Sequence, residues 1–303
     1  MTIQKNLDRF AGKPVVDFEG KRVADAVVYR LRQDYDDARS QERMLEDFFD
    51  TIAPGEVEAL VIGAWAEGHE HDPKAYLDGL IARKRELRQL KALFVGDITF
   101  EENEMSWIKQ TDYAGLLKAF PTLETLRIRG SDGLALPPFD HQHLAHLALE
   151  TGALPTAIVR NLAQSAMPAL KHLELWLGDD YYGFDGTVAD YQALLQAIDG
   201  ARLAYLGLRN AEIADPLAQW LAGEAWVAKL QVLDLSMGTL GDVGAQALLD
   251  SPHLDGILAL NLTHHYIGPE LQARLSKRFG PRVLLGDPQE EEDEGERFVE
   301  VSE

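Results

Sequence analysis

A hydrophobic pattern recurs along the chain, with large aliphatic residues at the first, fourth and sixth positions of each copy. One clear copy has Leu230, Leu233 and Leu235 at these positions. Alternation between the fourth and sixth positions is typical of a strand with one buried face. Successive copies start 33, 33, 21, 26, 33, 27 and 27 residues apart, which leaves room for a strand, a turn and a helix in each. The eight copies begin at Val57, Leu90, Leu123, Leu144, Leu170, Leu203, Leu230 and Ile257.

Helical patterns fill the intervals between the predicted strands. Several begin with Asp, Pro or both, as at Asp72-Pro73 and Asp215-Pro216, which is favourable chemistry for a helix start. Because strands and helices alternate, the strands are expected to form a parallel sheet in an α/β fold. The predicted helices span residues 73–88, 112–120, 155–165, 188–198, 216–223, 242–250 and 269–279.

Residues 230–249 add Leu240, Asp242, Gly244 and Leu248 to the strand pattern, and this unit resembles the ribonuclease-inhibitor-like class of leucine-rich repeats. The resemblance extends over roughly residues 57–285. It implies a leucine-rich-repeat solenoid (horseshoe), with a curved parallel sheet on the concave face and helices on the convex face.

Two stretches, residues 96–107 and 174–186, are similar to an uncharacterised bacterial cytoplasmic leucine-rich-repeat family, which has no assigned activity and supplies no catalytic residues. One departure from the repeat class concerns the ninth position, which usually carries Asn or Cys to tie the turn to its neighbour. This chain has none there, so the loops are expected to be held in another way. The ninth residues include Ser131, Gly178, Ala211, Gly238 and His265.

The repeats divide the chain into three predicted parts: an amino-terminal cap over residues 1–56, a solenoid over 57–286 and an acidic tail over 287–303. The cap contains a strand pattern at residues 14–18 and helical patterns at 23–31 and 43–52. The tail has nine acidic residues and one Arg, which is typical of a solvated segment. The alternative is an acidic arm that engages a basic partner, with residues 298–301 docking as a strand.

Composition narrows the class of partner. The chain has 303 residues, of which 46% are hydrophobic, so it can bury a large core. Its 29 Lys and Arg against 50 Asp and Glu give a net charge of −21, which repels nucleic acid and anionic membrane surfaces. Cysteine is absent and the start of the chain lacks a secretory signal pattern, so a cytoplasmic location is expected.

The third, fifth and seventh positions of each copy are expected to line the concave face. Small residues occupy these positions in the first and last copies, whereas large polar and aromatic residues occupy them in the middle. Exposed Trp, Tyr and Arg are common at the energetic centres of protein interfaces, so this patch is predicted to bind a protein partner. The alternative is that the charges pair along a solvated sheet and Trp176 stacks on Arg209. The predicted partner-binding residues are Arg127, Arg129, Glu150, His172, Glu174, Trp176, Tyr205, Arg209 and Asp234.

Within this patch the register places Arg129 beside Glu150 and Trp176 beside Arg209. The side chains of Trp176, Arg209 and Asp234 are expected to be exposed.

Metal chemistry has one candidate, the cluster His141, His143 and His146, with weaker pairs at His69/His71 and His264/His265. No thiolate can complete a structural zinc site, so these are interpreted as ordinary histidines and no metal or other cofactor is expected.

Two acidic groups follow predicted strands and raise the alternative of a cation or acid–base site in the strand-end loops. The first contains Asp97, Glu101, Glu102 and Glu104, and the second contains Asp179, Asp180 and Asp185. The aromatic loop 178–186 is either a contact element or locally packed. Phosphate-loop, dinucleotide and serine-hydrolase motifs are absent. We therefore predict a non-catalytic protein-binding module, the alternative being an enzyme or enzyme subunit with a metal or acid–base site in these loops.

Overall fold

The leucine pattern forms strands in the computed structural model, which describes residues 3–292 and 295–301. Strands and helices alternate along the chain, and within each unit the pairings of the described strands are parallel, except that between β1 and β2. The α/β class predicted from the sequence is confirmed. Two compact units divide the chain. The amino-terminal unit runs to Leu147 and includes Ser165–Ala169, and the carboxyl-terminal unit contains Ala148–Gln164 and the chain from Leu170 onward.

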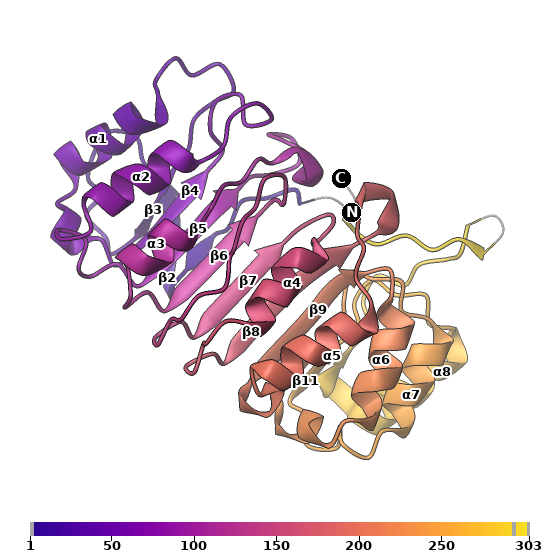
Figure 1. The fold of residues 1–303 in the computed structure, drawn as a ribbon. Helices are drawn as coiled ribbons and strands as arrows, with labels where there is room; N and C mark the ends of the chain where they lie inside the picture. The colour runs from indigo at the N-terminus through magenta and orange to yellow at the C-terminus, as the bar shows by residue number, and fades with distance from the viewer. Residues whose placement is uncertain (1–2, 293–294, 302–303) are drawn as a thin grey trace. The chain divides into compact units, whose positions relative to one another are not determined.

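In the amino-terminal unit, β1 pairs antiparallel with β2, and β2 to β6 then pair in chain order as parallel neighbours. Leu60, Leu93 and Leu126 occupy the fourth position of successive copies, lie side by side and are fully buried. Helices α1 to α3 lie on one side of these strands (Figure 1). The strands are β1 Arg9–Phe10, β2 Lys13–Asp17, β3 Val28–Leu31, β4 Ala59–Gly63, β5 Ala92–Asp97 and β6 Thr125–Arg129, and the helices are α1 Gln41–Thr51, α2 Lys74–Ala82 and α3 Ala114–Ala119.

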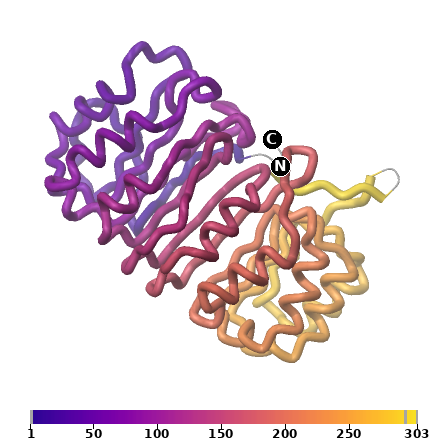
Figure 2. The backbone as a smooth tube through the Cα atoms, viewed as in Figure 1, coloured from indigo at the N-terminus to yellow at the C-terminus, as the bar shows by residue number. Residues whose placement is uncertain are grey.

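The carboxyl-terminal unit repeats this plan. Leu206 pairs with Leu173 on one side and with Leu233 on the other, and Leu233 pairs with Leu260. The successive turns of the chain can be followed in Figure 2. The strands are β8 His172–Gly178, β9 Tyr205–Ala211, β10 Val232–Asp234, β11 Ala259–Asn261 and β12 Val283–Leu284, and the helices are α4 Thr156–Ala163, α5 Val188–Ala197, α6 Ala214–Gly223, α7 Asp242–Asp250 and α8 Pro269–Phe279. Strand β7, His146–Glu150, contains the boundary between the units.

The predicted core register is confirmed. The side chains of Leu206, Leu208, Leu233 and Leu235 are buried, as strand alternation requires. Each is followed or preceded by a residue that faces the other side of the sheet, so one register error would have moved the whole set to the opposite face.

The helix predicted at residues 23–31 is wrong. Residues Val28–Leu31 form strand β3, which pairs with β2 and β4, and the sheet therefore extends into the predicted cap. The segment Val27-Val28-Tyr29 is rich in β-branched and aromatic side chains, which favour a strand when neighbouring strands are present. The other predicted cap helix is confirmed as α1, which begins after Ser40, whose hydroxyl accepts a hydrogen bond from the Arg43 amide at 3.2 Å.

In three consecutive copies the backbone takes a left-handed conformation one position before the missing Asn or Cys, at the end of β9 and in the loops after β10 and β11. Asn210, Met237 and His264 occupy the eighth position of consecutive copies and have φ of 53°, 70° and 62°. Left-handed backbone at a non-glycine residue costs free energy, which the repeated loop contacts offset. The loops are joined to one another by backbone hydrogen bonds, since the amides of Asn210, Met237 and His264 donate to the carbonyls of Ser236, Thr263 and Gly286 at 2.8–2.9 Å.

The acidic tail has two parts. Pro288, Glu290, Glu291 and Glu292 are exposed, whereas Val299 and Val301 are buried against the carboxyl-terminal unit. The tail is therefore solvated only in its first part. The predictions for residues 293, 294, 302 and 303 lie outside the described residues.

Glutamyl endopeptidase is expected to cleave after Glu290, Glu291 or Glu292 before it cuts either unit, because these residues are exposed and lie in irregular backbone. A time course followed by intact-mass measurement checks the order of cleavage. Resistance of this stretch under conditions that cut the units would show that the acidic segment is held as firmly as the fold.

Candidate functional site

The carboxyl-terminal unit brings six of the predicted partner-binding residues together on the strands β8, β9 and β10. His172 pairs with Tyr205, Trp176 pairs with Arg209, and Gly207 lies between Glu174 and Asp234. The predicted neighbours Trp176 and Arg209 are thus confirmed. The β8–β10 face is the name used below for His172, Glu174, Trp176, Tyr205, Arg209 and Asp234.

Arg209 is the centre of the β8–β10 face. Its Nη1 donates to Glu174 Oε1 at 2.6 Å, and its Nε donates to Ser236 Oγ at 3.0 Å and lies 3.6 Å from Asp234 Oδ1. The guanidinium lies 5.0 Å from the centre of the Trp176 ring, whose Nε1 donates to the same Glu174 oxygen at 2.7 Å. Burial alone would lower the pKa of Arg209, but the Asp234 and Glu174 carboxylates hold it above its ordinary value. Arg209 is therefore a permanent, fixed cation.

Tyr205 forms the second feature of this face. Its ring stacks on the His172 imidazole, with centres 3.9 Å apart and planes inclined by 7°. Its hydroxyl donates to Asp234 Oδ2 at 3.0 Å, and Asn261 Nδ2 donates to the same oxygen at 3.0 Å. Burial, followed by the negative charges of Glu174 and Asp234, raises the pKa of Tyr205, so the hydroxyl stays protonated and acts as a donor. Gly207 leaves room for this ring, because a Cβ there would lie 3.0 Å from it.

The expectation that Trp176 and Asp234 are exposed is wrong: their exposed fractions are 5% and 6%. Arg209 covers the indole, and Tyr205, Ser236 and Asn261 surround the Asp234 carboxylate. Glu174 and Glu150 are buried too. The side chains that retain exposed surface on this face are His172, Tyr205 and Arg209.

Arg127 and Arg129 lie in the amino-terminal unit, on β6. Their guanidinium groups lie 4.9 and 5.3 Å from the centre of the Phe94 ring. Arg129 is buried, since its Nη1 donates to the Ile98 carbonyl at 2.7 Å, and Arg127 is half buried. The predicted neighbours Arg129 and Glu150 belong to different units, and their adjacency stays a prediction.

Asp97 is fully buried and acts as a structural anchor. It forms ion pairs with Arg30 at 2.9 Å and Arg129 at 3.7 Å, and it accepts hydrogen bonds from the Leu7 amide. No role is predicted for Arg30 from the sequence, because residues 23–31 are expected to form a helix, whereas Arg30 lies on strand β3. At Glu102 burial would raise the pKa, but hydrogen bonds from Thr99 and Arg32 lower it below its ordinary value. The carboxylates of Asp97 and Glu102 are therefore both bound by other groups of the fold.

The three histidines of the metal candidate are bound to backbone or exposed. His141 is buried, with Nε2 3.0 Å from the Phe120 carbonyl and Nδ1 accepting from the Leu144 amide, and burial lowers its pKa. Nδ1 of the exposed His143 lies 3.0 Å from the Pro121 carbonyl, and His146 is exposed. This arrangement is that of an ordinary neutral core histidine with two surface neighbours.

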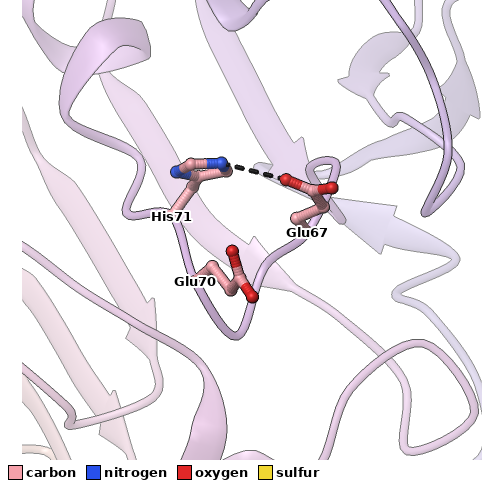
Figure 3. A group of neighbouring side chains, drawn as sticks. All are labelled: Glu67, Glu70 and His71. Carbon is pink, nitrogen blue, oxygen red and sulfur yellow. Dashed lines mark hydrogen bonds and ion pairs between the residues drawn. The ribbon is translucent and has the colours of Figure 1, made fainter.

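Among the described residues, the group with metal-ligand spacing is Glu67, Glu70 and His71, whose ligand atoms all lie within 4.8 Å of one another. Figure 3 shows the Glu67 carboxylate facing the His71 imidazole, at 3.1 Å, with Glu70 beside them. These residues line an open cavity of about 1070 Å³ in the amino-terminal unit. All three side chains are exposed, as in a conventional surface ion pair.

The 178–186 loop is mostly packed locally. Asp179 accepts from the Tyr182 amide at 3.2 Å, and burial raises the pKa of Asp179. Asp185 accepts from the Thr156 amide at 2.9 Å, which lowers its pKa. Tyr181 is 86% exposed and is the most exposed aromatic residue of this loop.

Among the described residues, none of the helices is both long enough and apolar enough to span a membrane.

Comparison with solved structures finds a protein from Bacteroides fragilis, solved as a structural-genomics target. It is 27% identical to this chain, and the match covers 92% of this chain and 79% of that one with a TM-score of 0.82. The leucine-rich repeat-containing protein LegL7 from Legionella pneumophila is 15% identical over 90% of this chain and 86% of that one, with a TM-score of 0.44, too low to support an argument. No family model matches the chain. No curated protein matches it either.

Proposed function

We propose that this leucine-rich-repeat-like α/β protein is a non-catalytic module that binds a protein partner through the β8–β10 face. The observation that carries the proposal is a set of half-buried side chains, His172, Tyr205 and Arg209, held by buried carboxylates. Tyr and Arg are the residue types that contribute most often to the energetic centres of interfaces.

Rigidity of these side chains favours binding. The Tyr205 ring is held by its stack on His172 and by its hydrogen bond to Asp234, and the Arg209 guanidinium is held by Glu174 and Ser236. A side chain that is already fixed loses little conformational entropy when a partner covers it, about 0.5–1.5 kcal/mol less than a free one. The side chains of this face are therefore preorganised for binding.

The chemistry of the face argues against catalysis. Glu174 accepts from Trp176 and Arg209, and Asp234 accepts from Tyr205, Ser236 and Asn261. Carboxylate oxygens already engaged by donors have little capacity left to accept a proton from a substrate, so Glu174 and Asp234 are poorly placed to act as general bases. The net charge of −21 supports a protein partner over nucleic acid or an anionic membrane.

The other predicted partner-binding residues differ in how much of their surface is exposed. Arg127 retains exposed surface on the amino-terminal unit and is proposed as a further partner contact. Glu174, Trp176 and Asp234 are buried and are proposed to hold Tyr205 and Arg209 in place, whereas Arg129 and Glu150 are buried and offer little surface to a partner.

Tyr205→Ala is expected to weaken capture of the partner by about 1–3 kcal/mol, or roughly 5- to 150-fold, because a rigid aromatic contact is lost. Quantitative mass spectrometry of proteins retained from host lysate by wild type and variant measures the effect. Tyr181→Ala is the matched control, because the same substitution is made at an exposed tyrosine of the 178–186 loop. Melting temperature serves as the folding control for both.

Retained capture in a folded Tyr205→Ala variant, together with loss in Tyr181→Ala, would move the binding site from the sheet to the loop. A protein that retains no partner but carries a bound metal or cofactor after purification would favour the enzyme alternative.

A further inference from the structure

An extended segment of the chain crosses the end of β9, which contains Asn210, and the loops that follow β10 and β11 in the carboxyl-terminal unit. This segment, Arg297 to Val301, is called the strap, and the loops are represented by Asn210, Met237 and Tyr266. Val299 and Val301 are buried, whereas Phe298 is exposed and Glu300 is half buried, which is the alternation of a strand. The yellow end of the trace in Figure 2 lies at this unit.

The loops bind the main chain of the strap. The buried side-chain amide of Asn210 accepts from the Val301 amide at 2.9 Å and donates to the Val301 carbonyl, as the edge of a strand would. The Met237 carbonyl accepts from the Glu300 amide at 2.8 Å, and the Tyr266 hydroxyl contacts both the amide and the carbonyl of Phe298. Contacts of this kind hold any extended segment and leave specificity to the side chains.

A charged slot receives the first residue of the strap. Arg297 Nη1 donates to Asp215 Oδ2 at 3.2 Å and to the Thr239 carbonyl at 3.3 Å, and its guanidinium lies 5.6 Å from the centre of the Tyr266 ring. Gly241 opens this slot, because a Cβ there would collide with the guanidinium. The slot therefore selects a basic side chain by charge and by the space that glycine leaves.

We infer that these loops form a binding site for an extended peptide segment of another protein, one with a basic residue followed by aliphatic residues at alternating positions, and that the strap is its intramolecular occupant. Residues 287–296 join the strap to β12 and contain seven acidic residues. Glu291 of this connection pairs with Arg297 at 2.6 Å, whereas mutual repulsion among the acidic residues of the connection opposes closure of the strap, so we expect the occupant to be exchangeable. The site adjoins the β8–β10 face at Met237, whose Sδ lies 2.8 Å from Arg209 Nη2, but its contacts with the strap are made by Asn210, Met237 and Tyr266 and not by the residues of that face.

The strap competes with any external peptide at an effective concentration of about 1 mM. A full-length variant with Val299→Asp and Val301→Asp removes the aliphatic anchors of the strap and leaves the loops intact. The probe is a fluorescein-labelled peptide with the sequence of residues 296–301, Glu-Arg-Phe-Val-Glu-Val. Its binding is measured by fluorescence polarisation.

The double variant is expected to bind the probe at least about tenfold more tightly than wild type, because the internal competitor is gone. Adding Asn210→Ala should abolish this binding, and adding Gly241→Ala should weaken it by closing the slot for the basic side chain. A probe with both valines replaced by aspartate should not bind. Thermal melting identifies the folded proteins.

Two results in the folded double variant would overturn the inference. It binds the probe no more tightly than wild type does, or it binds the probe no more tightly than it binds the aspartate probe. Either result would make the strap a fixed part of the fold. If the double variant does not fold, Arg297→Ala, which loosens only the first residue of the strap, replaces it in the same comparison and is judged by the same two outcomes.

Discussion

Leu233→Ala is expected to lower the free energy of unfolding by about 2–5 kcal/mol. Leu233 is fully buried on β10 and lies between Leu206 and Leu260 of the neighbouring strands, so truncation leaves a cavity that rigid parallel strands cannot close. Chemical denaturation measures the change.

Leu258→Ala is the matched control, because Leu258 lies in the same unit, directly before β11, and is 64% exposed. Its truncation is expected to change the free energy of unfolding by less than about 0.5 kcal/mol. Equal losses in the two variants would contradict the register on which the description of the sheet depends.

Arg209→Ala is expected to lower the free energy of unfolding by about 2–4 kcal/mol. Removal of the guanidinium leaves the buried carboxylates of Glu174 and Asp234 without their main cation, which is costlier than loss of a surface pair. The expected loss is placed below the largest values seen for buried pairs because the Arg209 side chain is 21% exposed.

Two further variants separate this effect from simple loss of an arginine. Arg274→Ala removes an exposed arginine of α8 whose Nη1 donates to Gln246 Oε1, and it should be nearly neutral. Combining Arg209→Ala with Glu174→Gln should cost less than the sum of the single changes, because the second removes the charge that the first leaves unpaired. Strict additivity would show that the two side chains do not act as a pair.

The sequence predicted the parts of the fold that depend on periodicity. Leucines at the fourth and sixth positions of each copy have one environment in any such repeat, and so the buried set that contains Leu206 and Leu233 could be identified before the structure was known. Strand β3 was missed because a short segment with Val28 and Leu31 three residues apart fits a helix as well as a strand, and only its pairing with β2 and β4 decides.

The candidate site could be predicted in position but not in exposure. The repeat positions place Trp176 beside Arg209 and on the same face of the sheet. Burial of the indole, however, depends on where the Arg209 side chain lies. The contacts of Asn210 with Val301 join residues 91 apart in the chain, and no local pattern indicates such a pairing. Long-range contacts between polar side chains and irregular backbone were therefore the part that the sequence could not show.

Hydroxyl-radical footprinting of the protein with and without its captured partner tests the proposed binding face most directly. The modification rates of Tyr205 and His172 are read together with that of Tyr181 as an internal reference in the 178–186 loop. Binding through the β8–β10 face predicts that Tyr205 and His172 become protected while Tyr181 reacts as before. Unchanged modification of Tyr205 and His172 in the complex would contradict it.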